Sequence, residues 1–209
     1  AGKKIGSMST WINKPYSRGR LQLRTPHWQD EPEVELNMLS DHRDMERIKI
    51  AMRRVSELFE QSPLKAATRD AFSTNFNRRA QLVSAITSRN KFLTSIASAL
   101  LEGPGFVRRA ILRDVILGKS IHEVVRRGNE AIEDHVRRYV ISIRHISCTC
   151  KMGSESDPLA VTAPDGRVYG VSGLRVADAS LFPSVPRANT NIPTIMTAEK
   201  IADTIISKA

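Results

Sequence analysis

Apolar and polar residues alternate in two short runs near the start of the chain. Leu21 and Leu23 alternate with polar neighbours, and the run Val34–Met38 repeats the pattern. A period of two residues is typical of a β-strand with one buried face. Prolines between the two runs favour a turn there. The pattern therefore predicts an antiparallel pair of strands within residues 10–39.

Apolar residues then return every three or four positions, which is the period of an amphipathic α-helix. Ser40 and Asp41 can cap this helix, and Asp44 places a carboxylate in its first turn, where the helix dipole favours negative charge. The steric restriction ahead of proline predicts that the helix ends before Pro63. The residues on its apolar face are Met45, Ile48, Met52, Val55 and Phe59.

Residues 64–128 favour further helices with a break at Gly103–Gly105. A helix is predicted from about Glu130 to Tyr139, and the alternating run Ile141–Arg144 is typical of a strand that leads to His145. Leu82, Ala85, Ile86 and Leu93 predict one helix before the break. Phe106, Ile111, Val115 and Ile116 predict another after it. Ile195, Met196, Ile201 and Ile205 predict a buried helix near the C-terminus.

The composition of the 209 residues is that of a globular protein, with 41% hydrophobic and 26% charged residues. A chain of this length can bury one sizeable core. Apolar runs stay well short of eighteen residues, so no membrane-spanning helix is predicted. The first residues lack an apolar run of the signal-peptide type, so we expect no secretory signal, and the compartment stays open.

Positive charge is concentrated in the first two thirds of the sequence. The formal net charge is +10, and residues 1–140 hold 25 Lys or Arg against 16 Asp or Glu, whereas residues 141–209 hold 7 against 6. A basic face is typical of nucleic-acid binders, but aromatic residues are only 5% and no helix-turn-helix, zinc or RNA-recognition motif occurs. A solvated face, or one that meets an acidic partner, is the favoured interpretation. Arginine pairs carry the excess: Arg53-Arg54, Arg78-Arg79, Arg108-Arg109, Arg126-Arg127 and Arg137-Arg138.

The two cysteines, Cys148 and Cys150, are separated by a single residue. An intrachain disulfide at this spacing would be badly strained, so we expect reduced thiols. Together with the nearby His145 they make too few ligands for a structural zinc site, and no metal is predicted.

Three motifs follow one another in the last third of the chain. His145-Ile-Ser-Cys-Thr-Cys-Lys-Met-Gly153 comes first, then Gly173-Leu-Arg-Val-Ala-Asp-Ala-Ser180, then Asn191-Ile-Pro-Thr194. In this order they resemble the C-terminal signature of the glucose-methanol-choline (GMC) family of flavin-dependent oxidoreductases. Upstream, Tyr16–Arg24 and Leu39–Asp44 look like the start of that family's substrate domain.

The resemblance implies that His145 and Asn191 are the catalytic residues. His145 would be the base that takes the hydroxyl proton of an alcohol while hydride leaves for flavin N5, a role that suits a group titrating near neutrality. The Asn191 amide would hold the substrate oxygen, since it can both donate and accept. The plainer alternatives are a histidine satisfied at a strand end and an asparagine that caps the last helix.

The resemblance also implies an FAD site at Asp178, Ala179, Asn191, Ile192 and Pro193. A helix that begins here would direct its positive end at the flavin ring. For the first two residues, a strand end followed by a turn is the alternative. Cys148 and Ile146 stand where the family usually has glycine and often has proline. A further alternative makes Cys148 a thiol that faces the flavin.

The glycine-rich dinucleotide fingerprint that the family carries in its N-terminal part does not occur in this sequence. We therefore expect a partner chain or fragment with that Rossmann unit, alongside a small-molecule alcohol substrate. The expected fold class is α+β. Residues 1–144 would form part of a substrate-binding domain, with an antiparallel sheet and covering helices. Residues 145–209 would supply strands and a helix that complete the FAD-binding domain.

Two other functions stay open at this point. The resemblance extends to hydroxynitrile lyases, which have the same fold and contain FAD without using it for redox chemistry. A non-catalytic basic module that binds nucleic acid or an acidic protein is the other alternative; the favoured prediction involves no nucleic acid.

Overall fold

A computed structural model describes residues 6–72, 86–115 and 119–207. The chain divides into two compact units. The first comprises Ala1–Trp11 and Met45–Val140, and the second comprises Ile12–Asp44 and Ile141–Ala209. Within the described ranges, no helix is both long and apolar enough to cross a membrane.

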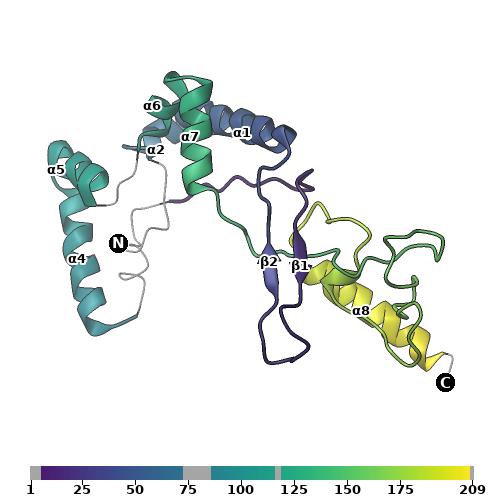
Figure 1. Ribbon diagram of the computed structural model, residues 1–209. Helices are drawn as coiled ribbons and strands as arrows, with labels where there is room; N and C mark the ends of the chain where they lie inside the picture. Colours follow the sequence, from purple (N-terminus) through teal and green to yellow (C-terminus); the bar gives the residue numbers. More distant parts are fainter. Residues whose placement is uncertain (1–5, 73–85, 116–118, 208–209) are drawn as a thin grey trace. The chain divides into compact units, whose positions relative to one another are not determined.

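The first unit is helical (Figure 1). The predicted helix that ends before Pro63 is confirmed as α1, His42–Glu60, and the one at Glu130–Tyr139 as α7, Asn129–Tyr139. The predicted break is confirmed too, because α4 ends at Glu102 and α5 begins at Gly105. The other helices among the described residues of this unit are α2 (Ser62–Ala67), α4 (Ser88–Glu102), α5 (Gly105–Ala110), a π-helical turn at Ile111–Val115, and α6 (Ile121–Arg126). Leu82, Ala85, Ile116 and the pair Arg78-Arg79 lie outside the described residues.

Apolar side chains of α1, α6 and α7 form the core of the first unit. Val124 of α6 lies at 5% exposure, and Ile132 of α7 is fully buried. Lys49 of α1 is buried as well, and its ammonium group pairs with Glu133 of α7 and with Glu46 at 2.7 Å. Hydrogen bonds to Glu133 and Glu46 raise the pKa of Lys49, which keeps the buried cation charged and joins α1 to α7.

A second polar group in this core lacks a partner. His135 of α7 is 8% exposed, and its Nδ1 atom is buried without a hydrogen-bond partner in the described structure. Its ring packs on Tyr139 with 4.8 Å between the ring centroids. Burial, and to a lesser extent repulsion from Lys119, lowers the pKa of His135, although Asp134 opposes the change. His135 is therefore held neutral.

This arrangement predicts a loss of stability in acid. The unfolded chain has a histidine of pKa about 6.5. In the pH interval between the lowered pKa of folded His135 and this value, the unfolded chain binds more protons than the folded chain. The free energy of unfolding should be constant with respect to this group above pH ~7 and should decline across that interval. Urea denaturation between neutral and mildly acid pH measures the slope. His135→Leu should reduce it, and an unchanged slope in the variant would contradict the assignment.

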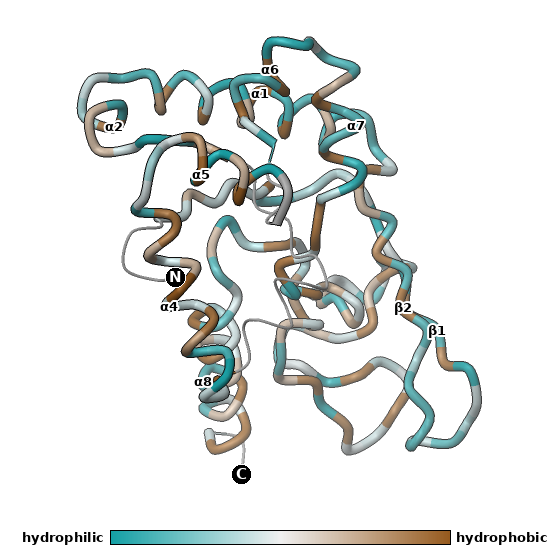
Figure 2. Tube along the Cα trace, turned by 90° about the vertical axis from the view of Figure 1, so that its left-hand side faces the viewer, coloured by the Kyte–Doolittle hydropathy of each residue, from teal (hydrophilic) through white to brown (hydrophobic). Residues whose placement is uncertain are grey.

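The second unit contains the predicted antiparallel pair, which is confirmed. Strands β1 (Arg20–Gln22) and β2 (Glu33–Glu35) pair with Leu21 opposite Val34 (Figure 1). The Arg20 guanidinium donates to both oxygens of Glu35 at 2.8 and 2.9 Å. The predicted buried face is wrong for this chain, since Leu21 and Val34 are 44% and 43% exposed. Figure 2 shows that the ribbon carries mixed polar and apolar positions.

The carboxylate of Asp44 fixes the segment before β1 to the first turn of α1. Its side chain, 1% exposed, accepts hydrogen bonds from the Tyr16 amide at 3.0 Å, from the Ser17 amide at 2.8 Å and from the Ser17 hydroxyl at 2.7 Å. The predicted cap is also present, because Asp41 accepts from the Arg43 amide at 2.9 Å. The Arg43 guanidinium lies 3.6 Å from the Tyr16 ring centroid.

The strand predicted at Ile141–Arg144 is wrong, and the strands expected within residues 145–209 are not observed among the described residues. The first segment has no ladder partner in the described chain, and Arg144 takes a left-handed conformation at φ 60° that ends any extended run. The second forms only isolated bridges, such as Arg167 with Arg175. The observed fold is thus mostly helical with one small two-stranded sheet. The expected larger sheet covered by helices is not observed in the described residues.

The predicted C-terminal helix is confirmed as α8, Asn191–Ile206. Its residue Ile201 is 4% exposed and joins Leu181, Phe182 and Thr162 in the core of the second unit. This small core holds together the loops that carry the three motifs.

Candidate functional site

All the site residues predicted from the sequence lie in the second unit, and backbone hydrogen bonds join the first two motifs. The amides of Cys148, Cys150 and Met152 donate to the carbonyls of Ala179, Ser180 and Leu181 at 3.1, 2.9 and 2.8 Å. Alternate residues of one segment thus bond successive residues of the other. The chain after His145 is thus joined to the Asp-Ala-Ser segment by bonds between main-chain atoms.

The loop between these motifs is built around buried Thr162. The Gly153 amide donates to the Thr162 carbonyl at 3.0 Å, and the Tyr169 hydroxyl donates to the Gly153 carbonyl at 2.9 Å. Gly166 has φ 78°, and a Cβ there would lie 2.6 Å from the Val176 carbonyl oxygen and 3.1 Å from Ile201 Cδ1. Only glycine allows this close approach to α8. The loop, the second motif and α8 therefore form one packed assembly.

Arg175, in the second motif, supports the same loop. Its guanidinium donates to the Asp165 carbonyl oxygen at 2.8 Å and lies 3.6 Å from the Asp165 carboxylate. Arg167 pairs with that carboxylate at 2.9 Å. The arginine of the motif thus has a structural role on the loop, which the sequence alone did not indicate.

His145 follows directly after the left-handed turn at Arg144. Its side chain is half-buried, and it makes no hydrogen bond with any other residue that the structure describes. The alternative was a histidine at a strand end whose side chain is hydrogen-bonded within the protein. The described residues give it no support, because they contain neither a strand before His145 nor a hydrogen-bond partner for its ring. The imidazole is available to an external group.

The structure explains the family's preference for glycine at position 148. Cys148 has φ 69°, in the left-handed region where a Cβ is disfavoured by roughly 1–2 kcal/mol per residue. Its thiol lies 3.5 Å from the Ser147 hydroxyl oxygen. Both cysteines are free thiols, as predicted. Cys148 therefore keeps the turn that glycine would form, at an energetic cost.

Cys148→Gly should stabilise the fold by about 1 kcal/mol, because relief of the left-handed strain exceeds the extra entropy of glycine in the unfolded chain. The matched control is Cys150→Gly. Its backbone is not left-handed and its amide makes the same kind of bond, so this variant should lose stability. Urea denaturation of both variants measures the difference. Equal effects of the two substitutions would refute the strain at position 148.

The Asp-Ala-Ser segment is a tight turn. Ala179–Leu181 form one turn of 3-10 helix, and Asp178 caps it by accepting from the Ser180 amide at 2.8 Å and the Ser180 hydroxyl at 2.5 Å. Asp178 is exposed, and Ala179 is half-buried. This turn agrees with the alternative in which Asp178 and Ala179 belong to an ordinary turn. Because Asp178 is exposed and Ala179 is small, the segment also leaves room for a ligand.

The third motif opens α8. Asn191 is the first helical residue and is exposed; Ile192 is 70% exposed, and Pro193 lies in the first turn. The alternative that Asn191 caps α8 is wrong, because Thr190 holds the N-cap position, without a side-chain cap bond. The side-chain oxygen of Asn189, one residue earlier, accepts from the Asn191 amide at 3.2 Å. The Asn191 side chain makes no hydrogen bond with another described residue, and none joins it to His145.

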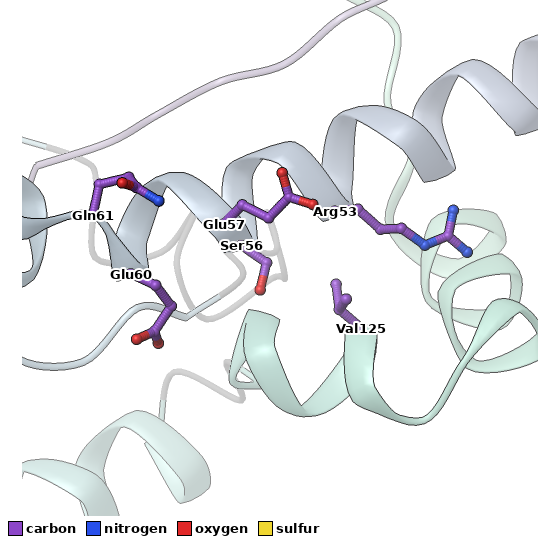
Figure 3. Close-up of a pocket in the computed structure, with 6 residues that line it drawn as sticks. All are labelled: Arg53, Ser56, Glu57, Glu60, Gln61 and Val125. Carbon is purple, nitrogen blue, oxygen red and sulfur yellow. The ribbon is translucent and has the colours of Figure 1, made fainter.

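A separate pocket of about 300 Å³ lies in the first unit (Figure 3). Nearby, the Ser56 hydroxyl is 2.8 Å from His122 Nδ1, and the other ring nitrogen is 3.5 Å from Glu60. Ser, His and Glu can form a nucleophilic triad, but Ser56 lies inside α1, where the backbone amides are bonded within the helix and cannot stabilise an oxyanion. The cluster is therefore a link between α1 and α6. The pocket is lined by Arg53, Ser56, Glu57, Glu60, Gln61 and Val125.

No group of three or more His, Cys, Asp or Glu side chains with the spacing of a metal site occurs among the described residues. The chemistry that the second unit can offer is thus that of an available imidazole, an amide and the positive end of a sixteen-residue helix.

These features agree with a comparison to known families. A family model described as GMC oxidoreductase matches residues 15–198. The chain belongs to the GMC oxidoreductase family and corresponds to its C-terminal domain.

Two curated relatives cover nearly all of the chain. The 5-(hydroxymethyl)furfural oxidase of Methylovorus sp. (strain MP688) is 36% identical over 98% of this chain and 32% of its own length. The oxygen-dependent choline dehydrogenase of Vibrio vulnificus (strain YJ016) is 30% identical over 94% of this chain and 26% of its own length. The chain therefore spans about a third to a quarter of these relatives.

A solved structure, an FAD-dependent oxidoreductase from Chaetomium thermophilum, has a TM-score of 0.64 at 22% identity. The match covers 94% of this chain and 26% of the Chaetomium thermophilum chain. At this identity the likeness establishes the fold only.

Proposed function

We propose that this chain is the catalytic C-terminal part of an FAD-dependent enzyme that oxidises an alcohol. The observation that carries the proposal is the available imidazole of His145, held by the three backbone bonds between the first two motifs. Membership of the GMC family, with relatives named as an oxidase and a dehydrogenase of hydroxyl compounds, supports it.

The residues at the start of α8 fit an FAD ring. Exposed Ile192 and neighbouring Pro193 present an apolar surface, and the positive end of the helix dipole favours negative charge next to it. Asp178 and Ala179 would contact a more polar part of the same cofactor. When bound, FAD would supply the hydride acceptor that the protein side chains cannot provide.

The chain's own residues would bind and deprotonate the substrate. His145 would accept the hydroxyl proton of the alcohol through a ring nitrogen, as a general base. Asn191 would donate a hydrogen bond to the same oxygen and hold it near the imidazole. Removal of the proton raises electron density on the oxygen and so favours departure of the hydrogen on the adjacent carbon as hydride.

The FAD-binding Rossmann unit would come from another part of the enzyme, as a partner chain or as a further stretch of the same polypeptide. Exposed apolar residues support such a contact in the second unit. Ile195 and Met196 on α8 are 51% and 65% exposed, and Leu21 and Val34 of the sheet are also open. In this arrangement residues 145–209 complete the FAD-binding domain, and residues 1–144 contribute to substrate binding.

The first experiment is an absorption spectrum of the material as purified, combined with mass analysis of every co-purifying polypeptide. Flavin bands, a second polypeptide or longer chain with the dinucleotide fingerprint, and bleaching on addition of an alcohol are expected. Flavin that never bleaches with alcohols but supports cleavage of a cyanohydrin would point to lyase chemistry. A colourless, folded chain that gains no flavin with any partner would overturn the proposal.

A further inference from the structure

The segment 141–147, which carries the proposed base His145, is held by few hydrogen bonds. It follows α7 and has no regular secondary structure (Figure 1). Among the described residues, the amides of this segment make a single hydrogen bond, in which the Arg144 amide donates to the Ser142 hydroxyl at 3.0 Å. The next backbone hydrogen bond along the chain is made by the Cys148 amide. The chain at His145 is therefore fixed by one bond before it and by the paired motif after it.

Arg144 adopts a backbone conformation that few residues with a Cβ take. Its φ is 60°, in the left-handed region. This region is unfavourable for arginine, and a residue stays in it only where its surroundings hold it there. The Ser142 hydroxyl supplies such a restraint, because a serine that accepts from the amide two residues later closes a local turn. The turn at Arg144 therefore depends on the Ser142 hydroxyl.

The turn at Arg144 sets the direction in which the chain enters His145. If Arg144 returned to the extended region, its φ would change by about 120° or more. Because the Cys148 amide is bonded to the Ala179 carbonyl at 3.1 Å, residues 145–147 would have to absorb that change. His145 is the first of them, and its imidazole makes no hydrogen bond with another described residue that would keep it in place. Loss of the turn would therefore move the imidazole while the first two motifs stay paired.

We propose that Ser142 is a positioning residue that holds His145 in place for proton transfer. The inference rests on the proposed function, in which His145 is the base. Ser142 would touch neither the substrate nor FAD, and its hydroxyl would act through the turn at Arg144. A base must lie within hydrogen-bond reach of the substrate hydroxyl, and a displacement of about 1 Å can lower a rate by about 10²-fold. Ser142 thus affects the chemical step rather than the binding of the alcohol.

The test is the steady-state kinetics of the flavin-loaded enzyme. The substrate is the alcohol that bleaches the flavin fastest in a panel of ethanol, benzyl alcohol and choline. Ser142→Ala should lower kcat by about tenfold or more and leave KM close to the parental value. The bond joins residues within one turn and links no other element, so the flavin content should also stay parental. Ser142→Thr keeps the hydroxyl and should restore most of kcat.

Hydrogen exchange measures the turn without reference to activity. The Arg144 amide should exchange faster in Ser142→Ala than in the parent, whereas the Cys148 amide should keep its protection. The matched control is Ser154→Ala, which removes the same kind of contact in an exposed loop, where the Ser156 amide donates to the Ser154 hydroxyl at 3.3 Å. This control should keep the parental kcat.

The outcomes separate the positioning role from the proposed function. An active parent whose Ser142→Ala variant keeps the parental kcat would overturn the positioning role alone. A loss of kcat that threonine does not restore, or that is accompanied by loss of flavin, would overturn it as well, because the hydroxyl would then not be the cause. A flavin-loaded parent that oxidises none of the alcohols would refute the proposed function and, with it, the role of Ser142.

Discussion

Asp44→Ala is expected to destabilise the protein by about 3 kcal/mol. The buried carboxylate accepts hydrogen bonds from two amides and a hydroxyl, and alanine would leave those donors without a partner inside the protein. It would also remove a favourable negative charge from the first turn of α1. Urea denaturation measures the change in the free energy of unfolding.

Hydrogen exchange gives a more local measurement of the same effect. The amides of Tyr16 and Ser17 should lose protection in Asp44→Ala, since Asp44 is their acceptor. The control is Glu57→Ala, which removes an exposed acid from the same helix and should change stability by less than about 0.5 kcal/mol. Full protection of both amides in Asp44→Ala would show that the carboxylate does not hold the segment.

The second large effect concerns catalysis. If His145 is the base, His145→Gln in the flavin-loaded enzyme should lower kcat by about 10²–10⁴-fold, the usual contribution of a positioned general base. Glutamine keeps hydrogen-bonding groups but cannot accept the proton. The fold should be preserved, because the His145 side chain makes no hydrogen bond with other described residues.

The flavin content distinguishes loss of a base from loss of structure. His145→Gln should lose the rate while keeping the flavin content of the parent. His27→Gln changes an exposed histidine of the loop between β1 and β2 and should leave kcat unchanged. A variant of His145 with the parental rate would remove this residue from the proposed mechanism.

Local patterns predicted the helices well, because an amphipathic period and its end signals are contained within one segment. Asp41, Asp44 and Pro63 marked the limits of α1 closely. The same approach failed for Ile141–Arg144, where alternation suggested a strand. A strand needs a neighbour to complete its hydrogen bonds, and a sequence run carries no information on whether one is present.

The candidate site shows a similar limit. The motifs identified His145, Asn191 and Asp178, but not the backbone pairing that holds the first two motifs together. Main-chain bonds leave little trace in residue type. The roles of Arg175 and Asn189 were missed for a related reason, since each depends on a partner that only the folded loop brings near.

The basic character of the first unit also depends on three-dimensional pairing. In four of the five Arg-Arg dipeptides, one arginine forms an ion pair with an acidic side chain. These arginines are Arg54, Arg108, Arg127 and Arg138. Arg78-Arg79 lies outside the described residues. Most exposed pairs of this kind contribute little to stability, yet they weaken the case for a continuous nucleic-acid-binding surface.

The pairing of Cys148, Cys150 and Met152 with Ala179–Leu181 sets different tolerances for two kinds of genetic change. Substitutions there keep the amides and carbonyls in place, which is how a cysteine can occupy a position that suits glycine. A single-residue insertion or deletion between Cys148 and Met152 would instead shift the bonds that follow it out of register. Variation in length should accumulate in the exposed stretch Ser154–Ser156, where the chain can lengthen without moving the proposed base His145.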